Sequence, residues 1–368
     1  MWTISENRSW AFLENRFYWV QRMREVPQDR YFHAEGNVAV HTQMVLEALE
    51  KEPAFLRLSD QEKEILWAAA LLHDVEKFST TVTEPDGRIT SHGHAKKGAL
   101  TTRAILYRDE ATPFQIREQI TGLVRYHGLP LWLLEKADPL KALIRAGLEV
   151  NTQWLSLLAR ADVLGRICDD QSDLLYRIDC FDEFCREHNC WGLARTFASD
   201  HARMYYLGKD DAHPDYVPFD EPQMEVIMMS GLPGAGKDTF IKKHFAGMPV
   251  ISLDGIRNEW KIDPTDKSGN GQVVQEAKEQ ARTFLRRRQG FIWNATNTTR
   301  SMRQQLTDLF ITYKAKVTIV YVEVPYAHLF KQNHQREAIV PASVIEKLVT
   351  KLEVPALWEA HQVHWHAL

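Results

Sequence analysis

The sequence feature that most constrains the fold is a glycine-rich turn between a short apolar run and a helical pattern. Residues 225–230 (EVIMMS) precede Gly231-Leu-Pro-Gly-Ala-Gly-Lys-Asp238, after which apolar residues recur at helical spacing. Three more apolar runs occur at 250–253, 290–294 and 317–323, and helical patterns accompany them at 239–245, 273–288, 301–313 and 341–351. Strands that alternate with helices predict βαβ units and a mostly parallel sheet.

The first 207 residues follow a different pattern. Apolar residues recur at helical spacing in 64–72, 116–124 and 154–164, prolines tend to fall between such segments, and no stretch alternates as an exposed strand does. Residues 208–223 carry three prolines and five acidic residues and have little periodicity. We therefore expect a multidomain chain, with an all-α domain over 1–207, a linker over 208–223 and an α/β domain over 224–368.

Composition excludes several classes of protein. Hydrophobic residues make up 44% of the 368 residues and charged residues 26%, which is typical of a globular chain and excludes overall disorder. The longest apolar run, residues 65–72, is too short to cross a bilayer, and the first residues lack a signal-peptide pattern, so we expect a cytoplasmic protein without a membrane partner. The net charge of -4 means that any attraction to nucleic acid must come from a local patch.

The four cysteines are Cys168, Cys180, Cys185 and Cys190, and three of them recur every five residues. A disulfide-stapled secreted domain would be smaller and richer in cysteine, and this spacing is not that of a CxxC pair, so we expect reduced thiols partly buried on a helix. A zinc site that combines these cysteines with His188 is the alternative.

The glycine-rich turn also predicts a phosphate-binding loop. It fits G-x-x-x-x-G-K-[ST] except at the last position, where Asp238 replaces the hydroxyl residue that binds Mg²⁺ and Thr239 follows as a substitute. Glycines let backbone N–H groups turn toward phosphates, and Lys237 adds a full positive charge, which a plain tight turn does not need. The candidate ATP-binding residues are Gly231, Pro233, Gly234, Ala235, Gly236, Lys237, Asp238, Thr239 and Asn297.

Two further segments carry candidate catalytic residues. Asp254 follows the second apolar run, at the sheet edge where ligands bind, and could accept the proton of an attacking hydroxyl. Arg257 could hold a phosphate of the acceptor; the alternative for Asp254 is the N-cap of the next helix. Arg336 lies between two helical patterns and could close over the transferring phosphoryl group, unless it is an ordinary surface arginine.

One arginine-rich stretch stands out from the acidic background. Six arginines lie within 22 residues that contain no Asp or Glu: Arg282, Arg286, Arg287, Arg288, Arg300 and Arg303. Arg300 and Arg303 follow the end of the third strand, so we expect them at the active-site edge, where they would favour a polyanionic acceptor. A solvated helix face is the alternative for some of them.

Residues 224–368 resemble the polynucleotide 5′-kinase family, which shares the phosphate loop, Asp254-x-x-Arg257, the strand end Thr296-Asn297 and an arginine lid. The resemblance implies transfer of a phosphoryl group from ATP to a 5′-OH, with Mg²⁺ and with Lys237, Asp254, Arg257 and Arg336 in the corresponding roles. Related kinases place an acidic residue just before the Thr-Asn pair, whereas this chain has Asn294 and Ala295. We hypothesise that the metal-side carboxylate has moved to Asp238.

The N-terminal part carries histidines and aspartates that suit divalent metals: His41, His73, Asp74, His94, His127 and Asp162. The His73-Asp74 pair lies in a strongly apolar helical pattern, where it is costly unless something binds it. A single histidine of this kind is more often a core residue, but this ordered set points to a metal site.

These residues resemble the HD superfamily of metal-dependent phosphohydrolases over about residues 30–170. The resemblance implies that His41, His73, Asp74 and Asp162 hold one metal and that His94 and His127 complete a second, with Ni²⁺, Mn²⁺, Co²⁺ or Fe²⁺ favoured over Mg²⁺. Lys77 would face the scissile phosphate. Residues 33–36 are similar to the HD domain attached to bacterial tRNA nucleotidyltransferases, which implies action on 2′,3′-cyclic phosphates and 2′-phosphates, with His33 at the phosphate or the leaving group.

Together the two parts resemble the bacterial HD–polynucleotide kinases. This implies healing of both ends of broken RNA, or also DNA, before a separate ligase seals them. One alternative is a signalling-nucleotide or nucleoside phosphohydrolase coupled to a small-molecule kinase, which would not need the arginine-rich stretch. Another is an ATP-gated RNA sensor with a degenerate HD site, against which the complete ligand set argues.

Overall fold

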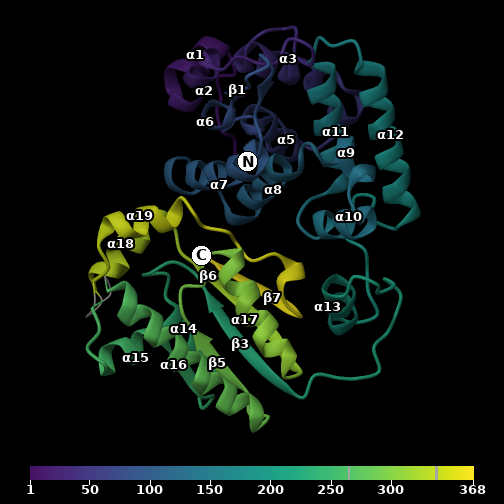
Figure 1. Ribbon diagram of the computed structural model, residues 1–368. Coiled ribbons are helices and arrows are strands. Elements are labelled where there is room, and N and C mark those ends of the chain that lie inside the picture. Colours follow the sequence, from purple (N-terminus) through teal and green to yellow (C-terminus); the bar gives the residue numbers. More distant parts are fainter. Residues whose placement is uncertain (264–265, 336–338) are drawn as a thin grey trace. The chain divides into compact units, whose positions relative to one another are not determined.

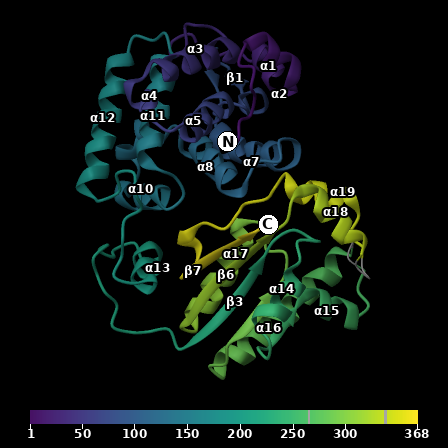
Figure 2. The same cartoon turned by 180° about the vertical axis from the view of Figure 1, so that it is seen from behind.

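The computed structural model describes residues 1–263, 266–335 and 339–368, and the chain divides into two compact units, Met1–Thr196 and Phe197–Leu368. The boundary between the units lies between Thr196 and Phe197, whereas we expected the first domain to extend to residue 207. The helix α13 (Asp200–Gly208) belongs to the second unit, because Arg203 donates to the carbonyl of His361 at 2.5 Å. Both ribbon views show α13 beside β7 (Gln362–Ala367) (Figure 1, Figure 2).

The first unit is almost entirely helical, as predicted. Its α-helices are α1 (Trp10–Arg16), α2 (Tyr18–Arg22), α3 (Val38–Lys51), α4 (Pro53–Leu56), α5 (Asp60–Leu72), α6 (Lys77–Thr80), α7 (His94–Ala104), α8 (Phe114–Tyr126), α9 (Leu129–Trp132), α10 (Pro139–Gly147), α11 (Thr152–Leu164) and α12 (Gln171–Glu187). Short 3₁₀ turns span Met23–Glu25 and Leu133–Glu135, and a π-helical turn spans Ile105–Asp109. The expectation of no strand is wrong at one place, where β1 (Val82–Thr83) and β2 (Ile89–Thr90) pair as a short hairpin.

The centre of this unit is α5, which explains its continuous apolar run. Ser59 and Glu62 form a capping box that begins the helix, and every residue from Ile65 to Leu72 is buried. The helices α3, α8 and α11 all pack against α5. A helix that is apolar on all sides is stable only with such neighbours, and its C-terminal end carries His73 and Asp74 into the middle of the unit.

The second unit contains a five-stranded parallel sheet in the order β4-β5-β3-β6-β7. The strands β3 (Met224–Ser230), β4 (Val250–Ser252), β5 (Phe291–Asn294) and β6 (Ala315–Glu323) confirm the four predicted runs, whereas the edge strand β7 was not predicted. The helices are α14 (Lys237–His244), α15 (Leu253–Glu259), α16 (Lys267–Arg286), α17 (Arg300–Thr312), α18 (Tyr326–His334) and α19 (Ala342–Val349). Within residues 209–223 the structure has no helix or strand.

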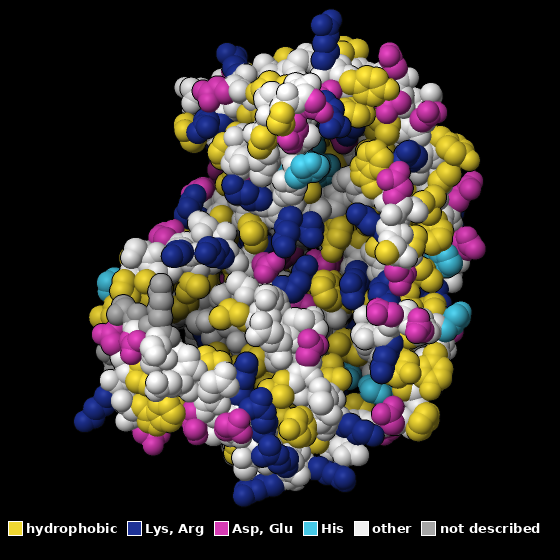
Figure 3. Space-filling view, viewed as in Figure 1, with side chains coloured by type: hydrophobic (Ala, Val, Ile, Leu, Met, Phe, Trp, Pro, Cys, Tyr) yellow, Lys and Arg dark blue, Asp and Glu magenta, His cyan; other side chains and the backbone are white. Residues whose placement is uncertain are grey.

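The core of the second unit lies between the sheet and two of its helices. Val226 and Met228 of β3 pack in one cluster with Val273 of α16 and Phe310 of α17, so these helices cover one face of the sheet. Hydrophobic side chains on the viewed surface occur in small groups between polar and charged ones (Figure 3). Among the described residues, no helix combines the length and the hydropathy that a membrane span requires.

Candidate active sites

The phosphate loop joins β3 to α14, and two of its glycines are required by close backbone contacts. Gly231 has a φ of +143°, and a Cβ there would lie 2.3 Å from the Val322 carbonyl oxygen. Gly234 has a φ of +82°, and a Cβ there would lie 2.7 Å from the Leu329 carbonyl oxygen. The loop can therefore fold tightly against β6 and α18 only with glycine at these positions.

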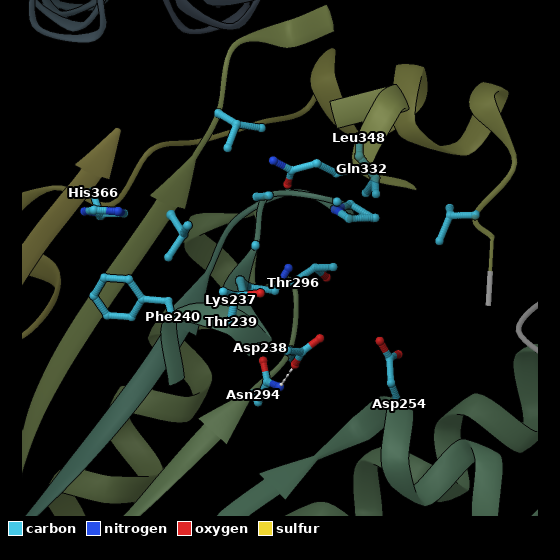
Figure 4. A pocket seen from close by; sticks show the side chains of 18 of the residues that line it. Lys237, Asp238, Thr239, Phe240, Asp254, Asn294, Thr296, Gln332, Leu348 and His366 are labelled. Atoms are coloured by element: carbon cyan, nitrogen blue, oxygen red, sulfur yellow. Dashed lines mark hydrogen bonds between the residues drawn. The ribbon is translucent and has the colours of Figure 1, made fainter. Parts of the chain in front are cut away.

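The loop borders a cavity of about 800 Å³ (Figure 4). Lys237 is the first residue of α14, and its Nζ donates to the carbonyl oxygens of Gly231 and Leu232 at 2.9 and 3.0 Å. Most of the predicted ATP-binding residues line the cavity: Pro233, Gly234, Ala235, Gly236, Lys237, Asp238 and Thr239. The cavity thus lies at the carboxyl edge of the sheet, as the βαβ pattern predicted.

Asn297 does not line this cavity, which differs from our expectation. Asn297 is buried, and its Nδ2 donates to the Met229 carbonyl oxygen at 2.7 Å. The Ser230 hydroxyl donates to the Asn297 carbonyl oxygen at 3.0 Å. Asn297 therefore ties the end of β5 to the end of β3 and supports the start of the phosphate loop from behind.

Asp238 and Asn294 lie side by side at the base of the cavity. Asn294 is the last residue of β5, and its Nδ2 donates to Asp238 Oδ1 at 2.7 Å (Figure 4). The carboxylate of Asp238 thus reaches the strand end where related kinases carry an acidic residue. This position fits the hypothesis that Asp238 supplies the metal-side carboxylate, because carboxylates are preferred Mg²⁺ ligands.

Asp254 and Arg257 lie on one face of α15, and both line the cavity. Their side chains form an ion pair, and Arg257 Nε also donates to Asn270 Oδ1 at 2.9 Å. The alternative that Asp254 caps this helix is wrong, since Ser252 is the N-cap and its hydroxyl accepts from Gly255 N–H at 3.1 Å. The Asp254 side chain remains 64% exposed and points into the cavity (Figure 4).

The arginine-rich stretch does not lie at the cavity. Arg303 is fully buried, pairs with Glu359 at 2.6 Å, and donates to the carbonyl of Glu353 at 2.8 Å. Arg300 lies 3.4 Å from Glu359 and over the Trp358 ring at 4.5 Å. Residues 286–288 precede β5 and so lie at the amino edge of the parallel sheet, opposite the phosphate loop. Arg300 and Arg303 do follow the carboxyl end of β5, as expected, but they pair with Glu359 and do not line the cavity, so the expectation that they face a polyanionic acceptor there is wrong. Arg336 falls outside the described residues.

In the first unit, five helices bring the predicted metal ligands together. His41 comes from α3, His73 and Asp74 from the end of α5, His94 from the start of α7, His127 from the end of α8 and Asp162 from α11. The ligand atoms form two groups in which they all lie within 4.8 Å of one another: His41, His73 and Asp162, and Asp74, His94 and His127. This division is close to the two metal positions that the sequence predicted.

Each histidine ring is oriented by a hydrogen bond at Nδ1. The Nδ1 atoms of His73, His94 and His127 lie 2.7, 2.7 and 2.8 Å from the carbonyl oxygens of Ala70, Ser91 and Val124. This contact fixes the proton on Nδ1 and turns the lone pair of Nε2 toward the centre of the cluster, as metal-binding histidines require.

The buried atoms at the centre fit a divalent cation. Within the described part of the chain, His41 Nε2, His73 Nε2 and both carboxylate oxygens of Asp74 are buried without a hydrogen-bond partner. Lys77 Nζ lies 2.8 Å from Asp74 Oδ2 as an ion pair, but it is not aligned for a hydrogen bond. Buried polar atoms without partners are costly, and a metal ion would satisfy all four.

Protonation in the cluster also suits a cation. Burial lowers the pKa of His127 to about 3, so this ring is neutral near pH 7. Burial would raise the pKa of Asp74, but His73 and Lys77 outweigh it and hold that pKa well below the usual range. Burial would lower the pKa of His73, but the Asp74 charge raises it, so a proton and a cation compete there. Neutral imidazole and ionised carboxylate are the forms that bind metals.

A small cavity of about 190 Å³ opens beside these ligands, and it is lined by His33 and Lys77, the residues expected at the phosphate, together with Arg166. Three supporting residues were missed. Glu35 Oε1 lies 2.8 Å from His33 Nδ1 and 2.9 Å from His41 Nδ1. Gln28 accepts from Lys77 Nζ at 2.6 Å, and Arg166 donates to Asp162 at 2.5 Å. The four-residue spacing of Asp162 and Arg166 was a usable signal, and Glu35 lies in the segment 33–36 that the resemblance had singled out, whereas nothing in the sequence indicated Gln28.

Comparisons with known proteins agree with this division. The family model of the HD domain matches residues 37–164, and that of an AAA domain matches residues 226–355. The chain is 25% identical over 142 residues to L-seryl-tRNA(Sec) kinase of Methanococcus maripaludis, a match that covers 35% of this chain and 53% of that protein. It thus spans about half the length of this curated relative.

Among solved structures, a kinase candidate from Chloroflexus aurantiacus matches with 16% identity and a TM-score of 0.34, over 40% of this chain and 87% of that one. The family matches and the two sites together identify the architecture. The chain contains an HD domain followed by a P-loop domain.

Proposed function

We propose that this protein heals the ends of broken nucleic acid, with RNA as the first substrate to test. The P-loop domain would transfer a phosphoryl group from ATP to a 5′-OH, and the HD domain would open a 2′,3′-cyclic phosphate and remove the resulting phosphate. The observation that carries the proposal is the placing of Asp254 and Arg257 in the phosphate-loop cavity, in the D-x-x-R arrangement of polynucleotide 5′-kinases.

The kinase step follows from the residues around this cavity. Backbone N–H groups of the loop and Lys237 would hold the donor phosphates, and Asp238 would face Mg²⁺. The oxygen of the 5′-OH would attack the γ-phosphorus, and Asp254 would accept the proton of that hydroxyl. The bond between the γ-phosphorus and the bridging oxygen would break and release ADP. Arg257 is held by Asp254 and Asn270 and would bind a phosphate of the acceptor strand. Arg336 as a lid residue remains an expectation from the sequence.

The relative's name supports an acceptor hydroxyl carried on RNA. An L-seryl-tRNA(Sec) kinase phosphorylates a hydroxyl that is attached to a tRNA, and its match to this chain is confined to part of both proteins. That acceptor is a seryl group carried by the tRNA, so we extend only the general property of an RNA-borne acceptor to the present chain.

The HD step would use the cluster and the groups at its cavity. Divalent metals would supply a nucleophile from water and stabilise charge on the phosphate. Lys77 and Arg166 line the cavity and would bind the phosphate oxygens, and His33, held by Glu35, would reach the leaving group. The RNA product would then carry a 5′-phosphate and a free 2′,3′-diol, the ends that a separate ligase joins. We propose the cytoplasm as the place of this reaction.

A small-molecule acceptor is the second candidate, and one observation favours it. The arginines expected to attract a polyanion lie away from the cavity or are buried. A polynucleotide acceptor still predicts a kinase KM that rises steeply with salt, because phosphate contacts release counterions. A nucleoside acceptor predicts a KM that is nearly independent of salt.

One substrate tests the main proposal: a synthetic RNA with a 5′-OH and a 2′,3′-cyclic phosphate. It is incubated with ATP, Mg²⁺ and each of Ni²⁺, Mn²⁺, Co²⁺ and Fe²⁺, using wild type, Asp254→Asn and Asp74→Asn. We expect wild type to change both ends and each variant to lose only the end that its own domain processes. If neither end changes while ATP is hydrolysed, the proposal is wrong and the small-molecule candidate takes its place.

A further inference from the structure

The wall of the HD cavity differs in chemistry from its floor. The floor consists of the metal-ligand cluster, with Lys77 and Arg166 beside it. Apart from His33, the remaining lining residues are Gly128, Leu131 and Trp132, none of which carries a charge. A site for inorganic phosphate or for a simple sugar phosphate has no use for an apolar wall, because such ligands expose polar groups on every side.

Trp132 stands at the mouth of this cavity. It is the last residue of α9 and is 42% exposed, whereas the preceding residue, Leu131, is buried in a core cluster with Ala159 and Val163. Single exposed hydrophobic residues are common on protein surfaces and need no explanation. Trp132 differs because it combines this exposure with a place in the lining of a cavity that holds the candidate metal ligands.

The indole ring is also held in place. The Arg177 guanidinium lies over the ring at 4.7 Å from its centroid, and Arg177 is fixed by Glu135 at 2.6 Å and by the Leu131 carbonyl oxygen at 3.3 Å. On another side, a Cβ at Gly128 would lie 3.9 Å from the indole Cδ1, so the backbone approaches the ring edge closely. An aromatic ring that is positioned and partly exposed can stack with a planar ligand without a large loss of entropy.

The size of the cavity decides which part of a ligand enters. Its volume of about 190 Å³ is below the roughly 300 Å³ at which pockets begin to enclose a whole drug-sized ligand. A phosphate and part of a sugar therefore occupy the interior, and a larger group attached to that sugar stays at the mouth, beside Trp132.

We infer that Trp132 stacks on the nucleobase of the nucleotide whose phosphate lies in the HD cavity, so that the HD domain selects phosphate esters bearing a planar aromatic base. This inference rests on the proposed function and specifies its substrate class. Every nucleobase has an aromatic face, so the contact favours nucleotides over sugar phosphates without favouring one base.

The test compares two substrates that differ only in the base. Adenosine 2′,3′-cyclic monophosphate and 1-O-methylribose 2′,3′-cyclic phosphate are hydrolysed in Mn²⁺ by the full chain as wild type, Trp132→Phe and Trp132→Leu. Phe12→Leu is the matched control, because Phe12 is 38% exposed and does not line the cavity. All variants are first shown by thermal unfolding to be folded.

We expect Trp132→Leu to raise the KM for the nucleotide, relative to the base-free substrate, by roughly 5- to 100-fold, the effect of losing one base–aromatic stack. Trp132→Phe should retain most of the preference, and Phe12→Leu should behave as wild type. Equal changes for both substrates would mean that Trp132 only supports the cavity wall, and this result, like no change at all, overturns the inference.

A binding measurement separates this inference from the proposed function. Equilibrium dialysis of adenosine 3′-monophosphate in EDTA measures the affinity of wild type and Trp132→Leu without turnover. If wild type hydrolyses neither cyclic phosphate, the proposed phosphoesterase activity is wrong, and the dialysis alone decides on Trp132. Weaker binding by Trp132→Leu supports the stacking contact, and equal binding refutes it.

Discussion

Two clusters of buried polar side chains, one in each unit, differ in how their atoms are paired. In the HD unit, His41, His73 and Asp74 are buried with atoms that have no hydrogen-bond partner within the described residues. In the P-loop unit, Arg303 is equally buried, but its guanidinium donates to Glu359 and to two backbone carbonyls. The comparison teaches that burial alone does not identify a site. Several such atoms gathered at one point, as in the HD cluster, indicate a ligand, whereas the paired atoms around Arg303 stabilise the fold.

The same difference separates the two sites in construction. The HD site is made of side chains from five helices and lies inside its unit. The phosphate site is made mainly of one backbone loop, and side chains such as Asp238 and Thr239 are exposed at its cavity. Substitutions at the first site should therefore affect both stability and ligand binding, and those at the second should mainly affect catalysis.

The largest effect should come from breaking the buried ion pair of the P-loop unit. Arg303→Met removes the main partner of the buried Glu359 carboxylate, which keeps Arg300 at 3.4 Å and the Ala356 N–H, and we expect this to lower the free energy of unfolding of that unit by about 3–5 kcal/mol. Denaturant unfolding measures the change. The control is Arg287→Met at an exposed position of the same stretch, for which we expect a change within about 0.5 kcal/mol. Similar small effects for both would contradict a structural role for Arg303.

In the absence of ATP, whose phosphates would complete the metal site at Asp238, metal binding should stabilise mainly the HD unit. At a free Mn²⁺ concentration 100 times its dissociation constant, the free energy of unfolding should rise by about 2.7 kcal/mol, because the ion binds the folded site alone. Hydrogen exchange resolves the two units, and amides of α5 and α11 should gain protection while those of β3 and β6 do not.

His41→Ala removes one ligand from the cluster and should abolish most of that gain. Equal protection of both units by Mn²⁺, or protection that survives in His41→Ala, would mean that the unpaired atoms of the cluster are not what the ion satisfies.

The order of strands and helices in the second unit could be predicted because its inner strands are apolar on both faces. The runs that became β3, β5 and β6 are buried almost throughout, so they stand out in the sequence. The edge strand β7 was missed since His364, Trp365 and His366 are not buried and break the apolar run. Its pairing with β6 comes from tertiary contacts that a local pattern does not carry.

The candidate sites were predictable where a motif fixes side-chain type and spacing. The phosphate loop and the six HD-type ligands are of this kind, and the structure brings each set together. The arginine-rich stretch was misread because the partner of Arg303, Glu359, lies 56 residues away in the sequence. Glu35 was missed for the same reason, since only the folded chain shows that its carboxylate lies between His33 and His41.

Moving the carboxylate from position 238 to position 294 tests whether the Mg²⁺ requirement of the phosphate site depends on where that carboxylate lies. We expect Asp238→Ser to raise the Mg²⁺ concentration for half-maximal kinase activity about tenfold, because one carboxylate near the metal is lost. The double variant Asp238→Ser/Asn294→Asp returns a carboxylate to the adjacent strand end and should recover most of that loss. Mg²⁺ titrations of initial rates measure both. An unchanged Mg²⁺ requirement in Asp238→Ser would show that Asp238 does not serve the metal.

The smallest effect concerns a paired histidine of the P-loop unit, His361, whose Nδ1 accepts from Val317 N–H at 3.1 Å. Burial, with His201 and Arg203 nearby, lowers its pKa to about 4 from the usual value of 6.5. Between about pH 6.5 and pH 4, His361 is therefore protonated in the unfolded chain but neutral in the folded one. The free energy of unfolding falls as the pH drops through this range. Between pH 6 and pH 5, wild type should lose about 1 kcal/mol more than His361→Gln, as denaturant unfolding at both values measures. If wild type and His361→Gln lose the same unfolding free energy, His361 is protonated in the folded protein. The contrast between this hydrogen-bonded histidine and the HD histidines with an unpaired Nε2 would then not hold.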